Sequence, residues 1–103
     1  MQSEFSCDMT ALTAEQRARH QALAHQLRPE VRAFVELTDG YGARFDSDAA
    51  TLLRLAEFIT LERLCCPCFT LAVEAEREHG PLWLRITGRD GVKPFIRAEF
   101  GIG

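Results

Sequence analysis

The sequence has no apolar run close to the about 20 residues that a membrane-spanning helix needs. Its first residues lack the basic and apolar regions of a signal peptide, so we expect a cytoplasmic protein that does not enter a membrane. The net charge is −3 and the basic side chains form no stripe, which argues against nucleic acid as a partner. In a reducing cytoplasm the four cysteines are expected to be free thiols, a metal site or a redox pair.

The motifs of several common enzyme classes are also missing. The sequence contains no glycine-rich dinucleotide fingerprint, no P-loop and no Gly-x-Ser-x-Gly element. Gly40-Tyr41-Gly42 indicates a turn and not a phosphate-binding loop. Cys65 and Cys68 have the spacing of a redox Cys-x-x-Cys pair, but they follow a predicted helix instead of opening one. This makes the segment a weak match to thioredoxin-like chemistry.

Hydrophobic periodicity and turn signals predict an α+β fold with the element order α-ββα-ββα. Thr13-Ala14-Glu15-Gln16 is a capping-box pattern that begins a helix, and Asp39-Gly40 is a strong hairpin turn signal. The two hairpins would form a four-stranded antiparallel sheet with the helices packed on it. The helices are expected at 14–28, 49–65 and 92–100, and the strands at 31–38, 41–45, 69–76 and 82–86.

The length suits a single α+β domain, in which two stretches of the chain resemble each other. Ala43-Arg44-Phe45 is similar to Leu84-Arg85-Ile86 in the matching strand. This predicts an internal duplication of a ββα unit with pseudo-twofold symmetry, although two hairpin–helix units would share such features by physics alone. The domain 1–103 would comprise an N-terminal segment 1–13, a helix 14–28, and ββα units at 31–66 and 68–101.

Alternation along the strands predicts an aromatic surface. Phe34 is expected on the outward face of its strand, and Trp83 and Arg85 on the outward face of theirs. Together they would form an exposed patch for a partner or for the second subunit of a homodimer. The alternative is that the first helix covers this face.

The clearest chemical signal is a group of three cysteines within four residues, Cys65, Cys66 and Cys68. Pro67 lacks a backbone donor and disfavours helical conformations in the residue before it, so the helix should end here. Cys65 is then expected in the last helical turn, Cys66 at the break and Cys68 at the start of the next strand. Glu62 lies one turn earlier on the same helix face.

Clustered sulfurs beside a carboxylate predict a site for a soft metal ion such as zinc, copper(I) or mercury(II). A thiolate is disfavoured at a helix C-terminus, and a bound cation would remove this penalty. The spacing differs from that of a zinc finger, which uses two separated pairs, so further ligands must come from elsewhere in the chain. Cys7 and His20 would reach the corner if the first helix packs beside the second. The candidate ligands are Cys7, His20, Glu62, Cys65, Cys66 and Cys68.

The predicted role is binding, buffering or sensing of a thiophilic metal ion. One alternative is a thiol-based redox or transferase enzyme, in which one cysteine is the nucleophile and Glu62 or His20 carries the proton. Another is an interaction module whose cysteines are structural, because free cysteine is often a core residue. Such a module would bind its partner through the face of Trp83.

Short motifs extend over nearly the whole chain. They are Cys7 with Met9-Thr10-Ala11-Leu12-Thr13 and Arg17-Ala18-Arg19-His20, the hairpin Asp39-Gly40-Tyr41-Gly42-Ala43-Arg44-Phe45, the corner Glu62-Arg63-Leu64-Cys65-Cys66-Pro67, and the end Leu84-Arg85-Ile86-Thr87-Gly88. In these motifs the chain resembles a family of small, mostly uncharacterised bacterial proteins with a Glu-Arg-x-Cys-Cys-Pro-Phe corner. The resemblance implies no settled activity, but it implies that Cys7, His20, Glu62, Cys65 and Cys66 form one motif set. Cys68 stands where the family has Phe, so it is an extra sulfur.

Overall fold

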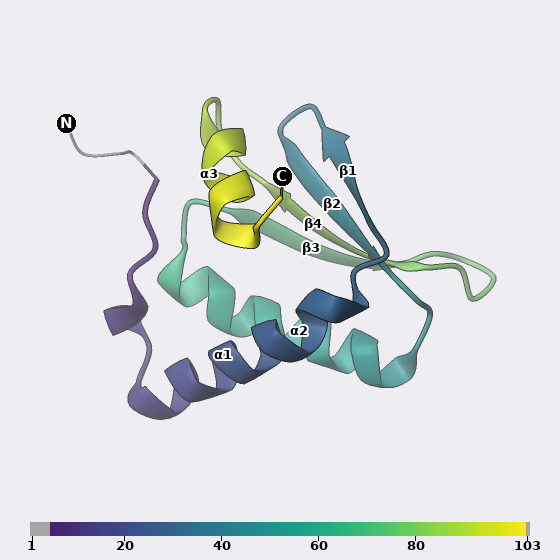
Figure 1. The fold of residues 1–103 in the computed structure, drawn as a ribbon, viewed down its shortest axis with the longest axis horizontal. Helices are drawn as coiled ribbons and strands as arrows, with labels where there is room; N and C mark the ends of the chain where they lie inside the picture. The colour runs from purple at the N-terminus through teal and green to yellow at the C-terminus, as the bar shows by residue number, and fades with distance from the viewer. Residues whose placement is uncertain (1–4, 103) are drawn as a thin grey trace.

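The elements of the chain follow the predicted order in the computed structural model, which describes residues 5–102 (Figure 1). The α+β class and the order α-ββα-ββα are therefore confirmed. The helices are α1 (Ala14–Leu27), α2 (Ala49–Cys65) and α3 (Val92–Phe100), with short 3-10 turns at Met9–Ala11 and Arg28–Glu30. The strands are β1 (Ala33–Leu37), β2 (Gly40–Phe45), β3 (Thr70–Ala75) and β4 (Leu82–Thr87).

The two long helices begin and end where their terminal residues predict. Thr13 and Gln16 form a reciprocal capping box, in which each side chain accepts the other residue's backbone N–H. Asp48 caps α2 by accepting a backbone N–H of the first turn. α2 ends at Cys65, two residues before Pro67, because a proline cannot continue the hydrogen-bond pattern of a helix. The local sequence therefore places Cys65 in a last helical turn.

The strands form one antiparallel sheet in the order β1-β2-β4-β3, so the two hairpins join through their second strands. Ala43 of β2 pairs with Leu84 of β4, and these are the positions that the sequence repeat makes equivalent. A pseudo-twofold axis between two such units would give this register. The origin of the symmetry in a duplication stays a prediction.

The first hairpin turns one residue earlier than the Asp39-Gly40 signal predicts. Leu37 pairs with Gly40, so Thr38 and Asp39 form the turn. Gly40 lies in β2 instead, where a Cβ would come within 1.9 Å of the carbonyl oxygen of Ile86. Glycine is therefore required for the close approach of β2 to β4 and not for the turn.

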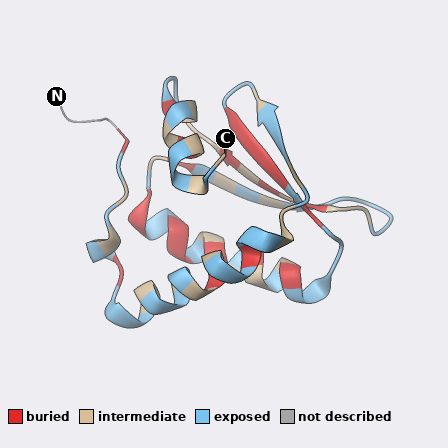
Figure 2. Cartoon of the chain, viewed as in Figure 1, coloured by how far each residue is buried: buried red, intermediate tan, exposed pale blue. Residues whose placement is uncertain are grey.

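The helices cover one face of the sheet, and the core lies between them and that face (Figures 1 and 2). α1 packs mainly on α2, whereas α3 contacts β2 and β4 directly. Lys93 of α3 donates to the carbonyl oxygen of Leu37, and Arg97 donates to the hydroxyl of Tyr41, which ties α3 to the sheet. The buried core includes Leu23, Leu27, Leu55, Phe58 and Ile96 from the helices and Tyr41, Ala43, Phe45, Leu82, Leu84 and Ile86 from the sheet.

The predicted aromatic patch on the outer face of the sheet is wrong. Phe34 pairs with Ala43 and faces the helices, whereas Trp83 faces outward near Val35, across Gly42. β1 is an edge strand in which no residue is fully buried and even the inward-facing Phe34 is exposed, so its apolar pattern did not identify the inner face. The alternative that the first helix covers the outer face is also wrong, because α1 lies on the opposite side.

Candidate cysteine site at the end of α2

The packing of α1 against α2 brings the segment before α1 to the cysteine corner. The ring of His20 stacks on that of Phe58, with centroids 5.2 Å apart. The backbone N–H of Asp8 donates to the carbonyl oxygen of Cys65 at 2.7 Å, which holds the N-terminal segment against the end of α2. The sequence analysis predicted that Cys7 and His20 would reach the corner if the first helix packs beside the second, and α1 does pack on α2.

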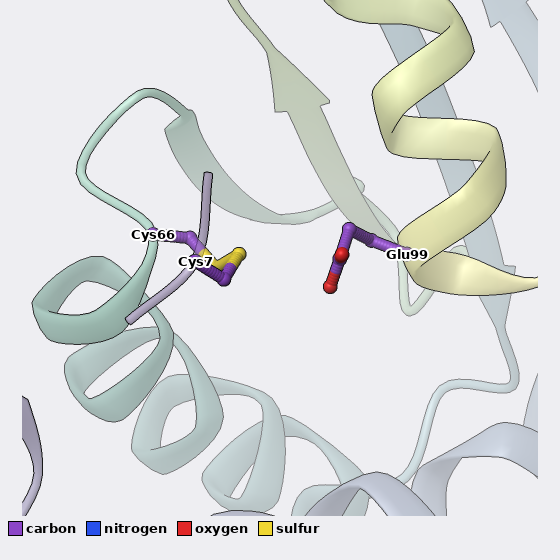
Figure 3. Close-up of side chains that lie close together, drawn as sticks. All are labelled: Cys7, Cys66 and Glu99. Carbon is purple, nitrogen blue, oxygen red and sulfur yellow. A yellow bond between two sulfur atoms is a disulfide. The ribbon is translucent and has the colours of Figure 1, made fainter. Parts of the chain in front are cut away.

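Cys7 and Cys66 are joined by a disulfide, with Cα atoms 4.4 Å apart and 59 positions apart in the sequence. Figure 3 shows the carboxylate of Glu99, on α3, directed toward this pair. A carboxylate oxygen of Glu99 and the two sulfurs all lie within 4.8 Å of one another. No sequence motif points to Glu99, because it lies on the last helix and no cysteine or histidine precedes it closely.

A second group of ligating atoms lies next to the disulfide. Nε2 of His20 is 2.8 Å from Oε1 of Glu62, and Sγ of Cys65 donates to the same oxygen at 3.6 Å. Glu62 is only 4% exposed, so its carboxylate is buried with His20 as its charged or polar partner. Buried carboxylates of this kind occur mainly where a partner or a metal ion compensates the lost hydration.

Burial raises the pKa of the Cys65 thiol from its ordinary value to about 11, and the nearby Glu62 carboxylate adds to the increase. Desolvation and a neighbouring negative charge both disfavour the thiolate. Cys65 therefore remains a protonated, weakly nucleophilic thiol at neutral pH unless a cation replaces its proton.

The two groups are adjacent, since Sγ of Cys65 lies 3.9 Å from Sγ of Cys66. Five of the predicted site residues are thus brought together: Cys7, His20, Glu62, Cys65 and Cys66. The structure does not add Cys68 to them. It is a half-buried free cysteine after the helix break, and it belongs to neither group of ligating atoms within residues 5–102.

A cavity of about 160 Å³ lies beside the site, between the helices and the inner face of the sheet. Both disulfide cysteines and the carboxylates of Glu62 and Glu99 are part of its wall. Most of the remaining wall is apolar and comes from α1, α2, α3 and the sheet: Ala24, Leu27, Val31, Phe34, Ala43, Phe45, Phe58, Leu84, Ile86 and Phe100. The sequence pattern does not predict this cavity, because its wall combines side chains from three helices and from the sheet.

No helix within residues 5–102 combines the length and the apolar character that crossing a bilayer requires. A comparison with protein-family models finds no match, and comparisons with curated proteins and with solved structures find no significant one.

Proposed function

We propose that the protein, with Cys7 and Cys66 reduced, binds one soft metal ion through the cysteine cluster at the end of α2. The observation that carries the proposal is the 3.9 Å separation between the sulfurs of Cys65 and Cys66. Two thiolates bound to one tetrahedral zinc ion at about 2.3 Å lie about 3.8 Å apart. Little movement would be needed for both sulfurs to bind the same ion.

Reduction of the disulfide would add the thiolate of Cys7, which lies against Cys66. The fourth ligand would come from Glu62 or His20, since Oε1 of Glu62 is 3.6 Å from the sulfur of Cys65 and contacts His20. The group that does not ligate would hold the other by a hydrogen bond, as outer-shell partners of metal ligands do. Cys68 has no part in this arrangement.

A soft cation also suits the electrostatics of the cluster. It would take the place of the Cys65 proton, because coordinated thiols lose their protons, and it would compensate the buried carboxylate of Glu62. Thiolate ligands are consistent with zinc, copper(I) or mercury(II), and the role would be binding, buffering or sensing of such an ion.

The proposed setting is the reducing cytoplasm, where Cys7 and Cys66 would be held as thiols. In the oxidised protein these two sulfurs are bonded to each other, and Cys65 is the one free thiol left in the cluster. Metal binding would then respond to the redox state. A homodimer and the absence of a nucleic-acid partner stay predictions, as does membership of the bacterial family that the motifs resemble.

The two alternative functions have weaker support. An enzyme with Cys65 as its nucleophile is disfavoured by the raised pKa of that thiol. An interaction module that uses the predicted aromatic patch is disfavoured because Phe34 and Trp83 lie on opposite faces of the sheet.

The test is metal binding by the reduced and the oxidised protein under anaerobic conditions. Reduced wild-type protein should retain about one equivalent of zinc or copper(I) in competition with a chromophoric chelator. The double variant Cys65→Ser/Cys66→Ser should lose more than about a hundredfold in metal affinity. Loss of a residue that only supports a ligand costs up to about a hundredfold, so a larger loss indicates that the ligands themselves were removed. Cys68→Ser is the matched control and should bind like the wild type. Unchanged affinity in the double variant would overturn the proposal.

A further inference from the structure

The cavity beside the disulfide has the size and lining of a binding site for a small apolar group. Its volume of about 160 Å³ compares with an engineered apolar cavity of about 150 Å³ that binds benzene. Most of its wall comes from aliphatic and aromatic side chains, including Leu27, Phe45, Leu84 and Ile86, and Arg28 adds a basic group. A metal ion bound by the cysteines has no need of such a space, so the cavity calls for a separate explanation.

The wall also holds polar groups, and three of them lie together at the disulfide. Cys7, Cys66 and Glu99 meet there, and Glu62 lies nearby. Cys66 is only 1% exposed, whereas Cys7 is half-buried. A molecule whose apolar part fills the cavity would thus present its reactive end to the sulfur of Cys7. His20 pairs with Glu62, so the carboxylate of Glu99, which lies beside the two sulfurs, is the group that would disfavour a negative charge on a molecule bound there.

We infer that the cavity binds a small apolar, uncharged thiol that reduces the Cys7–Cys66 disulfide by exchange. The sulfur of the thiol forms a bond to Sγ of Cys7, and the S–S bond breaks with its electron pair on Sγ of Cys66. The proton of the thiol passes to Cys66, with the carboxylate of Glu99 placed to carry it. A second thiol then attacks the mixed disulfide, which releases Cys7 as a thiol and the small molecule as its disulfide.

Two thiols are thereby oxidised to one small-molecule disulfide, and the protein disulfide is reduced to two thiols. This activity needs no metal ion, so it stands or falls independently of the proposed metal site. It would also deliver Cys7 and Cys66 in the form that the metal site requires.

The test compares two thiols of similar acidity, the apolar benzyl mercaptan and the polar 2-mercaptoethanol, in the presence of a metal chelator. The rate of disulfide reduction is followed by acid quenching, alkylation and mass spectrometry. The ratio of the rate with benzyl mercaptan to the rate with 2-mercaptoethanol is also measured in guanidinium-denatured protein. There it gives the preference between the two thiols in the absence of a cavity. Relative to that ratio, the folded protein should favour benzyl mercaptan by at least about tenfold, with a transient adduct on Cys7; this requires only about 1.4 kcal/mol of binding.

Variants that fill the cavity decide whether the preference arises there. Ala24 lies in the wall on α1, and both Ala24→Phe and the milder Ala24→Leu should lower the preference toward that of denatured protein. Gln21→Phe adds the same ring at an exposed position of α1 and should leave the preference unchanged. If Ala24→Phe does not fold, the comparison of Ala24→Leu with the wild type still decides whether the preference for benzyl mercaptan arises in the cavity. An equal ratio in folded and denatured wild type, or an undiminished preference in a folded Ala24 variant, would overturn the inference.

Discussion

Loss of the Cys7–Cys66 disulfide should lower the free energy of unfolding by about 4 kcal/mol, as the length of the closed loop predicts. The two cysteines are 59 positions apart, so the bond closes a loop that includes α1, the first hairpin and α2. A cross-link of this span removes much of the chain entropy of the unfolded state. Cys7→Ala is the better perturbation because Cys7 is half-buried, whereas Cys66 is buried and its replacement would also change the core.

The assay is urea unfolding of the oxidised wild type, the reduced wild type and oxidised Cys7→Ala. With the usual urea dependence of about 1–3 kcal/mol per molar, the midpoint should fall by more than about 1 M in both comparisons. Cys68→Ala is the matched control, because it removes a half-buried free thiol that no cross-link uses, and it should cost about 1 kcal/mol or less. Equal midpoints for oxidised wild type and Cys7→Ala would refute the reasoning.

Two further predictions concern the thiol of Cys65 and the glycines of β2. Because the pKa of Cys65 is about 11 in the folded protein and 9.0 in a free thiol, the unfolded chain ionises first as pH rises. The free energy of unfolding should therefore decrease between pH 9 and pH 11 by more in the wild type than in Cys65→Ala. If the urea midpoints of the two proteins fall equally over this pH range, the prediction is wrong. Gly40→Ala should cost about 3 kcal/mol or more, since its Cβ would meet the backbone of Ile86 at 1.9 Å. Gly42→Ala, whose Cβ would lie 3.2 Å from a side-chain methyl, should cost much less, and equal thermal shifts in the two variants would argue against this account.

Much of the secondary structure followed from short stretches of sequence. The capping residues Thr13 and Asp48 and the stop at Pro67 act within one helical turn, so the bounds of α1 and α2 are close to those predicted. The same local geometry placed Glu62 and Cys65 on one helix face, and the two side chains are in contact. The local turn signal was less accurate in the first hairpin. Gly40 is not in the turn, and a glycine is needed there because β4 approaches it closely.

The candidate ligands likewise differ in whether local sequence or contacts between distant segments position them. Cys65 and Cys66 are adjacent on one corner, so their proximity is a local property. Cys68 was expected to join them, but it lies after the break at Pro67 and belongs to neither group of ligating atoms in the part of the chain that the structure describes. Cys7 and His20 were predicted only on the condition that two helices pack together.

The sequence by itself determined the element order, the bounds of the long helices and the position of the cysteine corner, because hydrogen-bond caps, periodicity and proline act over a few residues. Only the tertiary structure decided that Cys7 bonds to Cys66, that Glu99 faces this pair, and that an apolar cavity opens beside it. These features join segments far apart in the chain, and they depend on how the helices pack on one face of the sheet. Packing of that kind follows from the fit of many side chains at once, which no single motif contains.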